Sequence, residues 1–215
     1  MRVRRCITNW LKACGVTALS RVDAPDPRVS DGQRPNLVAR IPGKSSRTLW
    51  LFGHTDVVPP GDLDAWTSNP WQVRREGDFL YGRGVEDNQQ AIVSMLLLAE
   101  EVLAHNITPE LSLGLVFMAD EETGSLFGLE HLLNTAPHFF NPDDLYIVPD
   151  AGSSKGDVIE IAEKSQLWIK VQTTGIQCHA STPQKGRNAF LAAADMALSC
   201  HNALRAAFGD ANPLF

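Results

Sequence analysis

Short apolar runs recur along much of the chain, and longer stretches of helical composition separate them. Strands that are apolar on both faces are typical of sheets that helices cover on both sides. The pattern therefore predicts an α/β fold with a mostly parallel sheet flanked by helices. The expected strands are Leu37–Ile41, Thr48–Gly53, Leu111–Ala119, Leu145–Pro149 and Asp157–Ala162.

Four helices are expected, and the composition changes before the last of them. A short amphipathic helix opens the chain, an apolar one covers Asn88–His105 and a shorter one covers Ser125–Asn134. Beyond residue 164, Gln166–Thr173 alternates as a half-buried strand does, and an alanine-rich helix is expected over Asn188–Phe208. We therefore expect a first domain over residues 1–164 and the start of an α+β domain over 165–215. One strand and one helix cannot satisfy their own backbone groups, so the second domain is expected to be incomplete or paired with another chain.

Charge and cysteine content exclude several classes of protein. The net charge is −6 and the pI about 5.5, which argues against nucleic acid or an anionic membrane as a partner. No apolar stretch reaches the roughly 18 residues that span a bilayer. None of the four cysteines forms a C-x-x-C pair. We expect reduced structural thiols in a cytoplasmic protein.

Side chains that suit a metal ion follow the ends of three expected strands. They are His54 and Asp56, Glu121 and Glu122, and Asp150. Each alone has an ordinary explanation as a loop histidine, a first helical turn or a turn aspartate. Together they lie at the carboxyl ends of strands, where open α/β sheets bind ligands. Adjacent carboxylates can also divide two tasks, one as a metal ligand and one as a general base.

A fourth polar cluster is YGRGVEDNQQ, residues 81–90. Its G-x-G lacks the third glycine of a dinucleotide fingerprint, so a nucleotide-binding interpretation is not favoured. Asp87 can be the N-cap of the following helix, or it can offer both oxygens to cations. One histidine with several carboxylates suits Zn²⁺, and also Mn²⁺ or Co²⁺. The acids exceed what one ion needs, which favours a two-metal site that Asp87 bridges.

Five ordered motifs resemble those of the M20 metallopeptidases. They are GHTDVVPPGD, YGRGVEDNQQ, ADEETGS, VPDAGSS and GIQCHASTPQKGRNA, the last ending at residue 189. That group includes succinyl-diaminopimelate desuccinylases, acetylornithine deacetylases, aminoacylases and carboxypeptidases that release glutamate. The resemblance implies hydrolysis of an amide bond in an N-acyl amino acid or short peptide.

The resemblance also implies a role for each site residue. His54 and Asp150 would bind one ion, Glu122 the other, and Asp87 both. Asp56 would orient His54, and Glu121 would be the general base. In the family, the peptide bond after the bridging aspartate tends to be cis, which here is Asp87–Asn88.

The motif in the second domain implies a different role for His179. It would reach across a homodimer into the partner's active site and stabilise the oxyanion.

This chain departs from the family pattern in two respects, and these leave open an alternative to an active hydrolase. Relatives often carry a lysine and a glycine where this chain has Asn88, Gln89 and Gln90, and they supply another metal-binding histidine near the C-terminus. His201 lies in the alanine-rich stretch without a matching context. We therefore expect the N-terminal part of a longer enzyme. The alternative is a folded, metal-binding but catalytically incomplete fragment.

Overall fold

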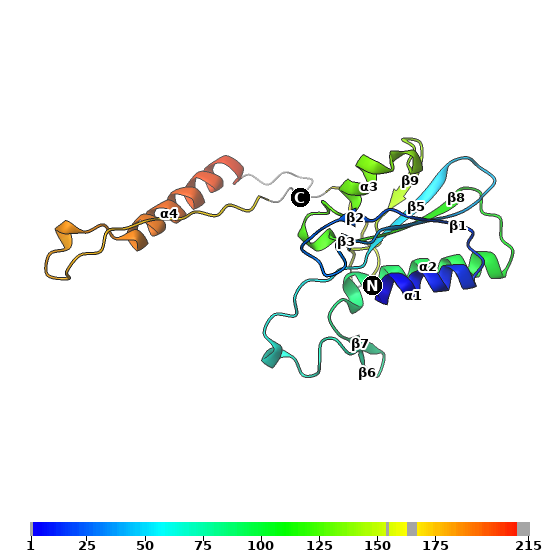
Figure 1. The fold of residues 1–215 in the computed structure, drawn as a ribbon, viewed down its shortest axis with the longest axis horizontal. Helices are drawn as coiled ribbons and strands as arrows, with labels where there is room; N and C mark the ends of the chain where they lie inside the picture. The colour runs from blue at the N-terminus through cyan, green and yellow to red at the C-terminus, as the bar shows by residue number, and fades with distance from the viewer. Residues whose placement is uncertain (1, 154, 163–166, 210–215) are drawn as a thin grey trace. The chain divides into compact units, whose positions relative to one another are not determined.

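The computed structural model describes residues 2–153, 155–162 and 167–209 and is shown in Figure 1. It contains two compact units, Met1–Ser154 and Lys155–Phe215. The domain boundary expected near Lys164 falls outside the described residues. Within the described ranges, no helix combines the length and apolar character needed to cross a membrane.

The first unit is built on a five-stranded sheet in the order β1-β4-β8-β5-β9. Strand β5 pairs in parallel with β8 and β9, whereas β4 pairs antiparallel with β8 and β1. The expected α/β fold is confirmed, with a mixed sheet whose parallel strands lie at its β8–β5–β9 side. The strand bounds are Ala18–Arg21 for β1, Leu37–Ile41 for β4, Thr48–His54 for β5, Ser112–Met118 for β8 and Leu145–Ile147 for β9.

Helices cover both faces of this sheet, as Figure 1 shows. Helices α1 (Arg2–Ala13) and α2 (Gln90–Ala104) pack on one face, and α3 (Leu129–Thr135) with the 3₁₀ turn Pro137–Phe139 packs on the other. Every residue of β8 is buried, as expected for a central strand between two layers. The larger core, on the α1 and α2 side, includes Ile7, Leu11, Leu37, Ala39, Met95, Leu96, Ala99, Leu115 and Phe117; the smaller includes Val38, Trp50, Phe52, Val116, Met118 and Leu132.

The fully buried Trp50 ties the centre of the sheet to its β9 edge. The indole ring lies over Gly114 of β8, where an added Cβ would come within 2.1 Å of the ring. The indole N–H donates to the carboxylate of Asp144 at 2.9 Å, and the backbone N–H of Thr48 donates to the same carboxylate at 2.7 Å. Asp144 thereby fixes the entry to β9 against β5.

Two hairpins and several short turns complete the first unit. Their bounds are β2 Ala24–Pro25 with β3 Gln33–Arg34, β6 Arg74–Glu76 with β7 Phe79–Tyr81, and the short helical turns Leu63–Ala65, Val85–Gln89 and Glu121–Thr123. Helix α3 begins four residues later than expected from the apolar pattern, because Ser125 has a positive φ of 59° and Gly128, directly before the helix, has a non-helical φ of −102° and ψ of −109°. A helix cannot run through a residue in either conformation.

The second unit contains helix α4 (Ala189–Phe208) and the 3₁₀ turn Pro183–Lys185. Asn188 caps α4 by accepting hydrogen bonds from the N–H groups of Phe190 and Leu191. An isolated bridge pairs Ile176 with Arg187.

Two predicted strands are not formed. Asp157–Ala162 and the described part of Gln166–Thr173 have no strand assignment, so both predictions are wrong for this structure. A strand is completed only by hydrogen bonds to a neighbour, and alternation of residues does not supply one. The apolar positions stay open to solvent: the side chains of Leu167 and Ile169 are 83% and 70% exposed.

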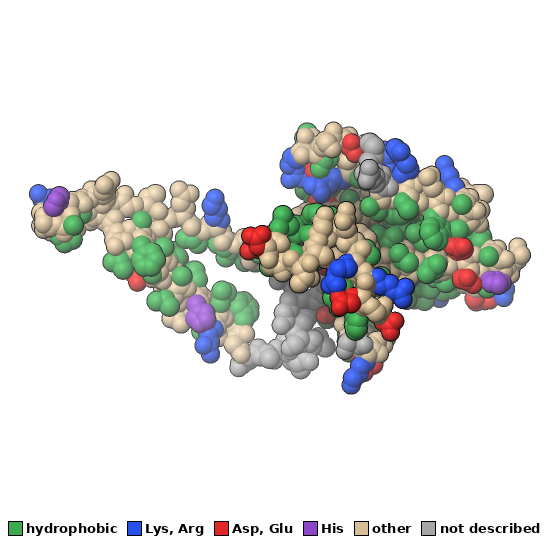
Figure 2. All heavy atoms as spheres, turned by 90° about the horizontal axis from the view of Figure 1, so that it is seen from below, with side chains coloured by type: hydrophobic (Ala, Val, Ile, Leu, Met, Phe, Trp, Pro, Cys, Tyr) green, Lys and Arg blue, Asp and Glu red, His purple; other side chains and the backbone are tan. Residues whose placement is uncertain are grey.

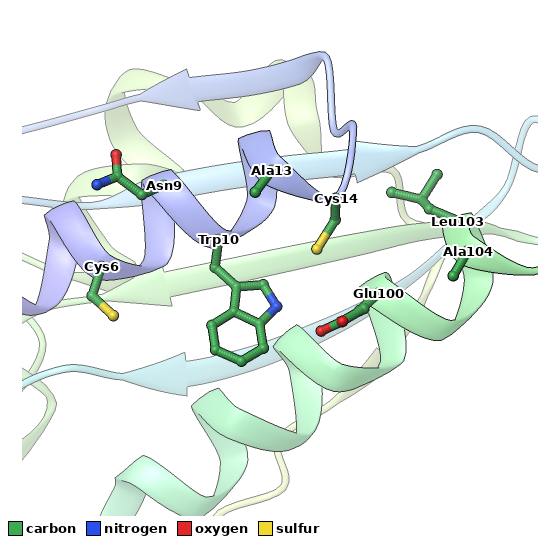
Figure 3. A pocket seen from close by; sticks show the side chains of 8 residues that line it. All are labelled: Cys6, Asn9, Trp10, Ala13, Cys14, Glu100, Leu103 and Ala104. Atoms are coloured by element: carbon green, nitrogen blue, oxygen red, sulfur yellow. The ribbon is translucent and has the colours of Figure 1, made fainter.

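The first unit also exposes apolar surface on the side of α1 and α2. Val93, Leu97 and Leu98 of α2 are exposed, and Figure 2 shows hydrophobic side chains over a broad part of this face. A groove of about 750 Å³ between the two helices is lined by Cys6, Trp10 and Cys14 among others (Figure 3). Burial, and then the charge of Glu100, raises the pKa of the Cys14 thiol, which keeps it protonated. All four cysteines are free.

Candidate metal centre

His54 ends β5 with its ring fully buried and both nitrogens engaged. Its Nδ1 lies 3.0 Å from the backbone oxygen of Asp56 and 3.6 Å from the carboxylate of the same residue. Its Nε2 faces carboxylates, with Asp87 at 2.9 Å, Asp150 at 3.7 Å and Glu121 at 3.9 Å. Asp56 therefore orients the ring, and Nε2 points to the place where acids from three other segments converge.

The electrostatics of this place favour a cation. Burial disfavours a charged imidazole, but the hydrogen bond to Asp56 and the negative charges of Asp56, Asp150 and Glu121 raise the pKa of His54 to about 9. Such a pKa favours the protonated imidazole near pH 7 when no ion is bound, and the proton then balances part of the excess negative charge. A divalent cation can take over that balance, provided that His54 gives up its proton.

The turn after β8 delivers Glu121 and Glu122. The parallel register places His54 opposite Met118, so the ends of β5 and β8 lie at the same edge of the sheet. The Asp56 carboxylate accepts hydrogen bonds from the N–H groups of Glu121 and Glu122 at 3.2 and 3.3 Å. The carboxylate of Glu122 in turn accepts from the N–H of Val58 at 2.9 Å. Asp56 thus positions both the imidazole and the acidic turn.

The environment of Glu121 differs from that of an ordinary surface acid. Burial raises its pKa, the positive charge of His54 opposes this, and the charges of Asp150 and Glu122 add to the rise. A carboxylate whose pKa is raised towards neutrality is a better proton acceptor near pH 7.

Asp87 lies three residues before the start of α2 and is not its N-cap. Its backbone is not helical, and no side chain caps the helix. The Asp87–Asn88 peptide bond is cis, as the motif led us to expect.

Asn88 is a site residue that sequence reasoning missed. It is fully buried; its Oδ1 accepts from the N–H of His54 at 3.2 Å, and its Nδ2 donates to Asp150 Oδ1. The side chain therefore links the end of β5 to the acid that follows β9. The available signal was its place directly after Asp87 in the motif.

The sequence-predicted ligands come together in two overlapping groups. His54, Glu121 and Asp150 form one, and His54, Asp87 and Glu122 form the other, each with donor atoms within 4.8 Å of one another. One imidazole nitrogen with carboxylate oxygens is a donor set suited to Zn²⁺, Mn²⁺ or Co²⁺. The residues present fit a divalent ion.

His179 belongs to the second unit, where it is exposed. Its Nδ1 lies 2.8 Å from the hydroxyl of Ser181 and accepts from the N–H of Ser181 at 3.2 Å. Its expected action across a dimer stays a prediction.

A mixed α/β sheet that gathers an imidazole and several carboxylates at its strand ends offers the kind of donor set that metallohydrolases use. The model of the peptidase family M20/M25/M40 matches residues 50–213, and the chain belongs to this family.

Curated relatives agree with that assignment. The chain is 44% identical to an uncharacterized metallohydrolase of Methanocaldococcus jannaschii over 85% of this chain and 45% of that protein. It is 41% identical to a similar metallohydrolase of Methanococcus maripaludis over 95% of this chain and 48% of that protein. A succinyl-diaminopimelate desuccinylase of Stenotrophomonas maltophilia is 30% identical over 68% of this chain and 40% of its own length. The chain thus spans about half the length of the curated relatives it matches.

Solved structures show the same fold. Human carnosine dipeptidase 1 superposes with a TM-score of 0.58 at 22% identity, covering 70% of this chain and 32% of that one. An M20 family metallo-carboxypeptidase from Sulfolobus solfataricus superposes with a TM-score of 0.58 at 24% identity, covering 71% and 33%. At these identities the likeness concerns the fold alone.

Proposed function

We propose that this chain carries the metal centre of a hydrolase that cleaves the amide bond of an N-acyl amino acid or a short peptide. The observation that supports the proposal is the convergence of His54, Asp87, Glu121, Glu122 and Asp150 at one edge of the sheet. Succinyl-diaminopimelate desuccinylases among the relatives agree with an N-acyl amino acid as the class of substrate.

The proposed site holds two divalent ions, with Zn²⁺ expected first and Co²⁺ or Mn²⁺ as alternatives. His54 and Asp150 would hold one ion, Glu122 the other, and Asp87 would contact both. When bound, such ions supply Lewis acidity and lower the pKa of water towards 7. Asp56 and Asn88 keep His54 and Asp150 in place, as partners behind metal ligands do.

Glu121 is the proposed general base. Its raised pKa suits it to take a proton from the attacking water and to pass that proton to the leaving amine. The C–N bond thereby breaks, with the hydroxyl of the water on the carbonyl carbon and its other proton on the amine nitrogen. His179 of a second subunit would stabilise the oxyanion, which makes a homodimer part of the proposal; the cytoplasmic location likewise stays a prediction.

A second candidate is metal binding without catalysis by this chain alone. The chain spans 45% and 48% of the lengths of two relatives. This favours the second candidate, because the remaining parts of those proteins leave room for further site residues. Hydrolysis of N-acyl amino acids and dipeptides by the purified chain separates the two candidates.

The decisive measurement is metal content, by elemental mass spectrometry after purification without chelators, on the native chain and two variants. Asp87→Ala removes the proposed bridging ligand, whereas Glu86→Ala removes the neighbouring exposed carboxylate. We expect up to two ions in the native chain, the same in Glu86→Ala and a loss in Asp87→Ala. Full metal content and activity in Asp87→Ala would overturn the proposal.

A further inference from the structure

A buried ionic network lies behind the turn that carries Glu121 and Glu122. Asp26, on the hairpin β2–β3, accepts from Arg28 Nε at 2.8 Å and from Arg34 Nε at 2.8 Å. Arg34 also reaches Asp120 Oδ1 with Nη1 at 3.0 Å. The side chains of Asp26 and Asp120 are 0% and 3% exposed, so Arg34 neutralises two carboxylates that water does not reach.

Asp120 organises the turn around itself. Its φ is +69°, a conformation that aspartate tolerates better than most residues. Its carboxylate accepts from the hydroxyl of Thr123 at 2.5 Å and from the N–H of Phe127 at 3.1 Å. Its backbone oxygen accepts from the N–H of Ser125 at 2.7 Å. The side chain and the backbone oxygen of Asp120 therefore both stabilise the conformation of the segment that contains Glu121 and Glu122.

Asn36 holds the two sides of the same turn together. It is fully buried, accepts from the N–H of Ala119 at 3.0 Å and donates to the backbone oxygen of Phe127 at 2.9 Å. Asp56 engages the turn from the metal side, through the N–H groups of Glu121 and Glu122. The turn is thus held by Asp56 on the side of the candidate metal site, and by Arg34, through Asp120, and Asn36 on the other side.

We propose that Arg34 is a positioning residue, which by pairing with Asp120 holds Glu121 and Glu122 in the orientation that metal binding and proton transfer require. The inference rests on the proposed function for its chemistry, because Glu122 is there a metal ligand and Glu121 the base. The side-chain contacts of Arg34 are with Asp26, Asp120 and the ring of Phe127, none of which is a proposed metal ligand. Arg34 therefore acts on Glu121 and Glu122 indirectly, through the backbone conformation of the turn that Asp120 stabilises.

Arg28 provides a matched control. It binds the same Asp26 carboxylate through two side-chain nitrogens and packs over the same Phe127 ring. Towards Asp120 it has a longer-range charge interaction, and among the described residues no hydrogen bond or ion pair joins the two. Arg28→Gln and Arg34→Gln therefore each remove one guanidinium from Asp26, and only Arg34→Gln releases Asp120. Arg34→Lys keeps the charge but loses the planar guanidinium that contacts both carboxylates. Its effects should therefore be intermediate between those of Arg28→Gln and Arg34→Gln.

Two readouts test the proposal. Amide hydrogen exchange on the metal-free chain reports whether the N–H groups of Glu121 and Glu122 stay protected, and calorimetric titration with Zn²⁺ and Co²⁺ reports affinity. We expect Arg34→Gln to speed exchange of these two amides and to weaken metal binding about tenfold, as loss of a partner behind metal ligands does. In Arg28→Gln, the exchange rates of these amides and the metal affinity should stay within about twofold of the values for the native chain.

The outcomes separate the two proposals. Equal effects of Arg34→Gln and Arg28→Gln on exchange and affinity would overturn the role of Arg34. Faster exchange in Arg34→Gln alone, in a chain whose native form binds neither metal, would support the role of Arg34 in holding the turn and contradict the proposed function. If Arg34→Gln does not fold, Thr123→Val removes another hydrogen bond to Asp120 from the exposed side, and unchanged exchange in that variant would count against the proposal.

Discussion

The two units of the chain make different use of apolar residues. In the first unit, apolar runs become strands because neighbouring strands complete them, and β8, which has a neighbour on each side, is buried along its whole length. In the second, α4 has no buried residue, and the apolar segment that includes Leu167 and Trp168 forms no strand. The difference shows that an apolar pattern sets which side chains can be buried, whereas partners decide whether they are.

The largest expected effect contrasts the same substitution in the two units. Leu115 of β8 is 0% exposed and Leu167 is 83% exposed. We expect Leu115→Ala to lower the free energy of unfolding by about 2–5 kcal/mol, through lost burial and a cavity. Leu167→Ala should change it by no more than about 0.5 kcal/mol. Chemical denaturation measures both, and a comparable loss in the two variants would break the contrast.

Metal binding should stabilise one unit and not the other. An ion present at a hundred times its dissociation constant stabilises the state that binds it by about 2.7 kcal/mol. Because the proposed metal ligands all lie in the first unit, amides of β5 and β8 should exchange more slowly with Zn²⁺ and recover with a chelator. Amides of α4 should be unaffected, and a matching slowdown there would show that the units respond together.

A helix cap tests the second unit by itself. Asn188 accepts two backbone hydrogen bonds at the start of α4, and Asn188→Ala should weaken that helix by about 1 kcal/mol. Asn202→Ala, inside the same helix, should instead strengthen it by some tenths of a kcal/mol because alanine has the higher helix propensity. Hydrogen exchange of α4 amides measures both, and the opposite order would mean that Asn188 does not cap the helix.

The smallest expected change follows from pH in the first unit. Hydrogen bonds from Arg28, opposed by burial and reinforced by Arg34, hold the pKa of Asp26 well below its usual range. A lowered folded-state pKa contributes stability above the unfolded value of about 4, and that stability is lost as the pH falls below it. The native chain should therefore lose stability more steeply below about pH 4 than Asp26→Asn, in thermal melts across that range. Parallel curves would assign the acid sensitivity to other carboxylates.

The sequence predicts the central strands and most of the site for a physical reason. Strands β4, β5, β8 and β9 coincide with local apolar runs, and His54, Glu121 and Asp150 follow the strand ends where ligands gather. The hairpin β2–β3 carries no such run, so neither it nor the pairing of Arg34 with Asp120 is visible in local composition. The strands expected in the second unit fail for the same reason, since their existence depends on partners that a local pattern does not contain.

The parallel register that sets His54 opposite Met118 also has a consequence for folding kinetics. Asp87 approaches His54 from 33 residues further along the chain, and Asn88 reaches Asp150 across 62 residues. Such non-local contacts form only after the cost of loop closure has been met, so the donor set is completed late, once the sheet is in register. An ion that needs all of these donors would bind the finished sheet and not its precursors, and the time course of metal uptake during refolding would follow the last step of assembly.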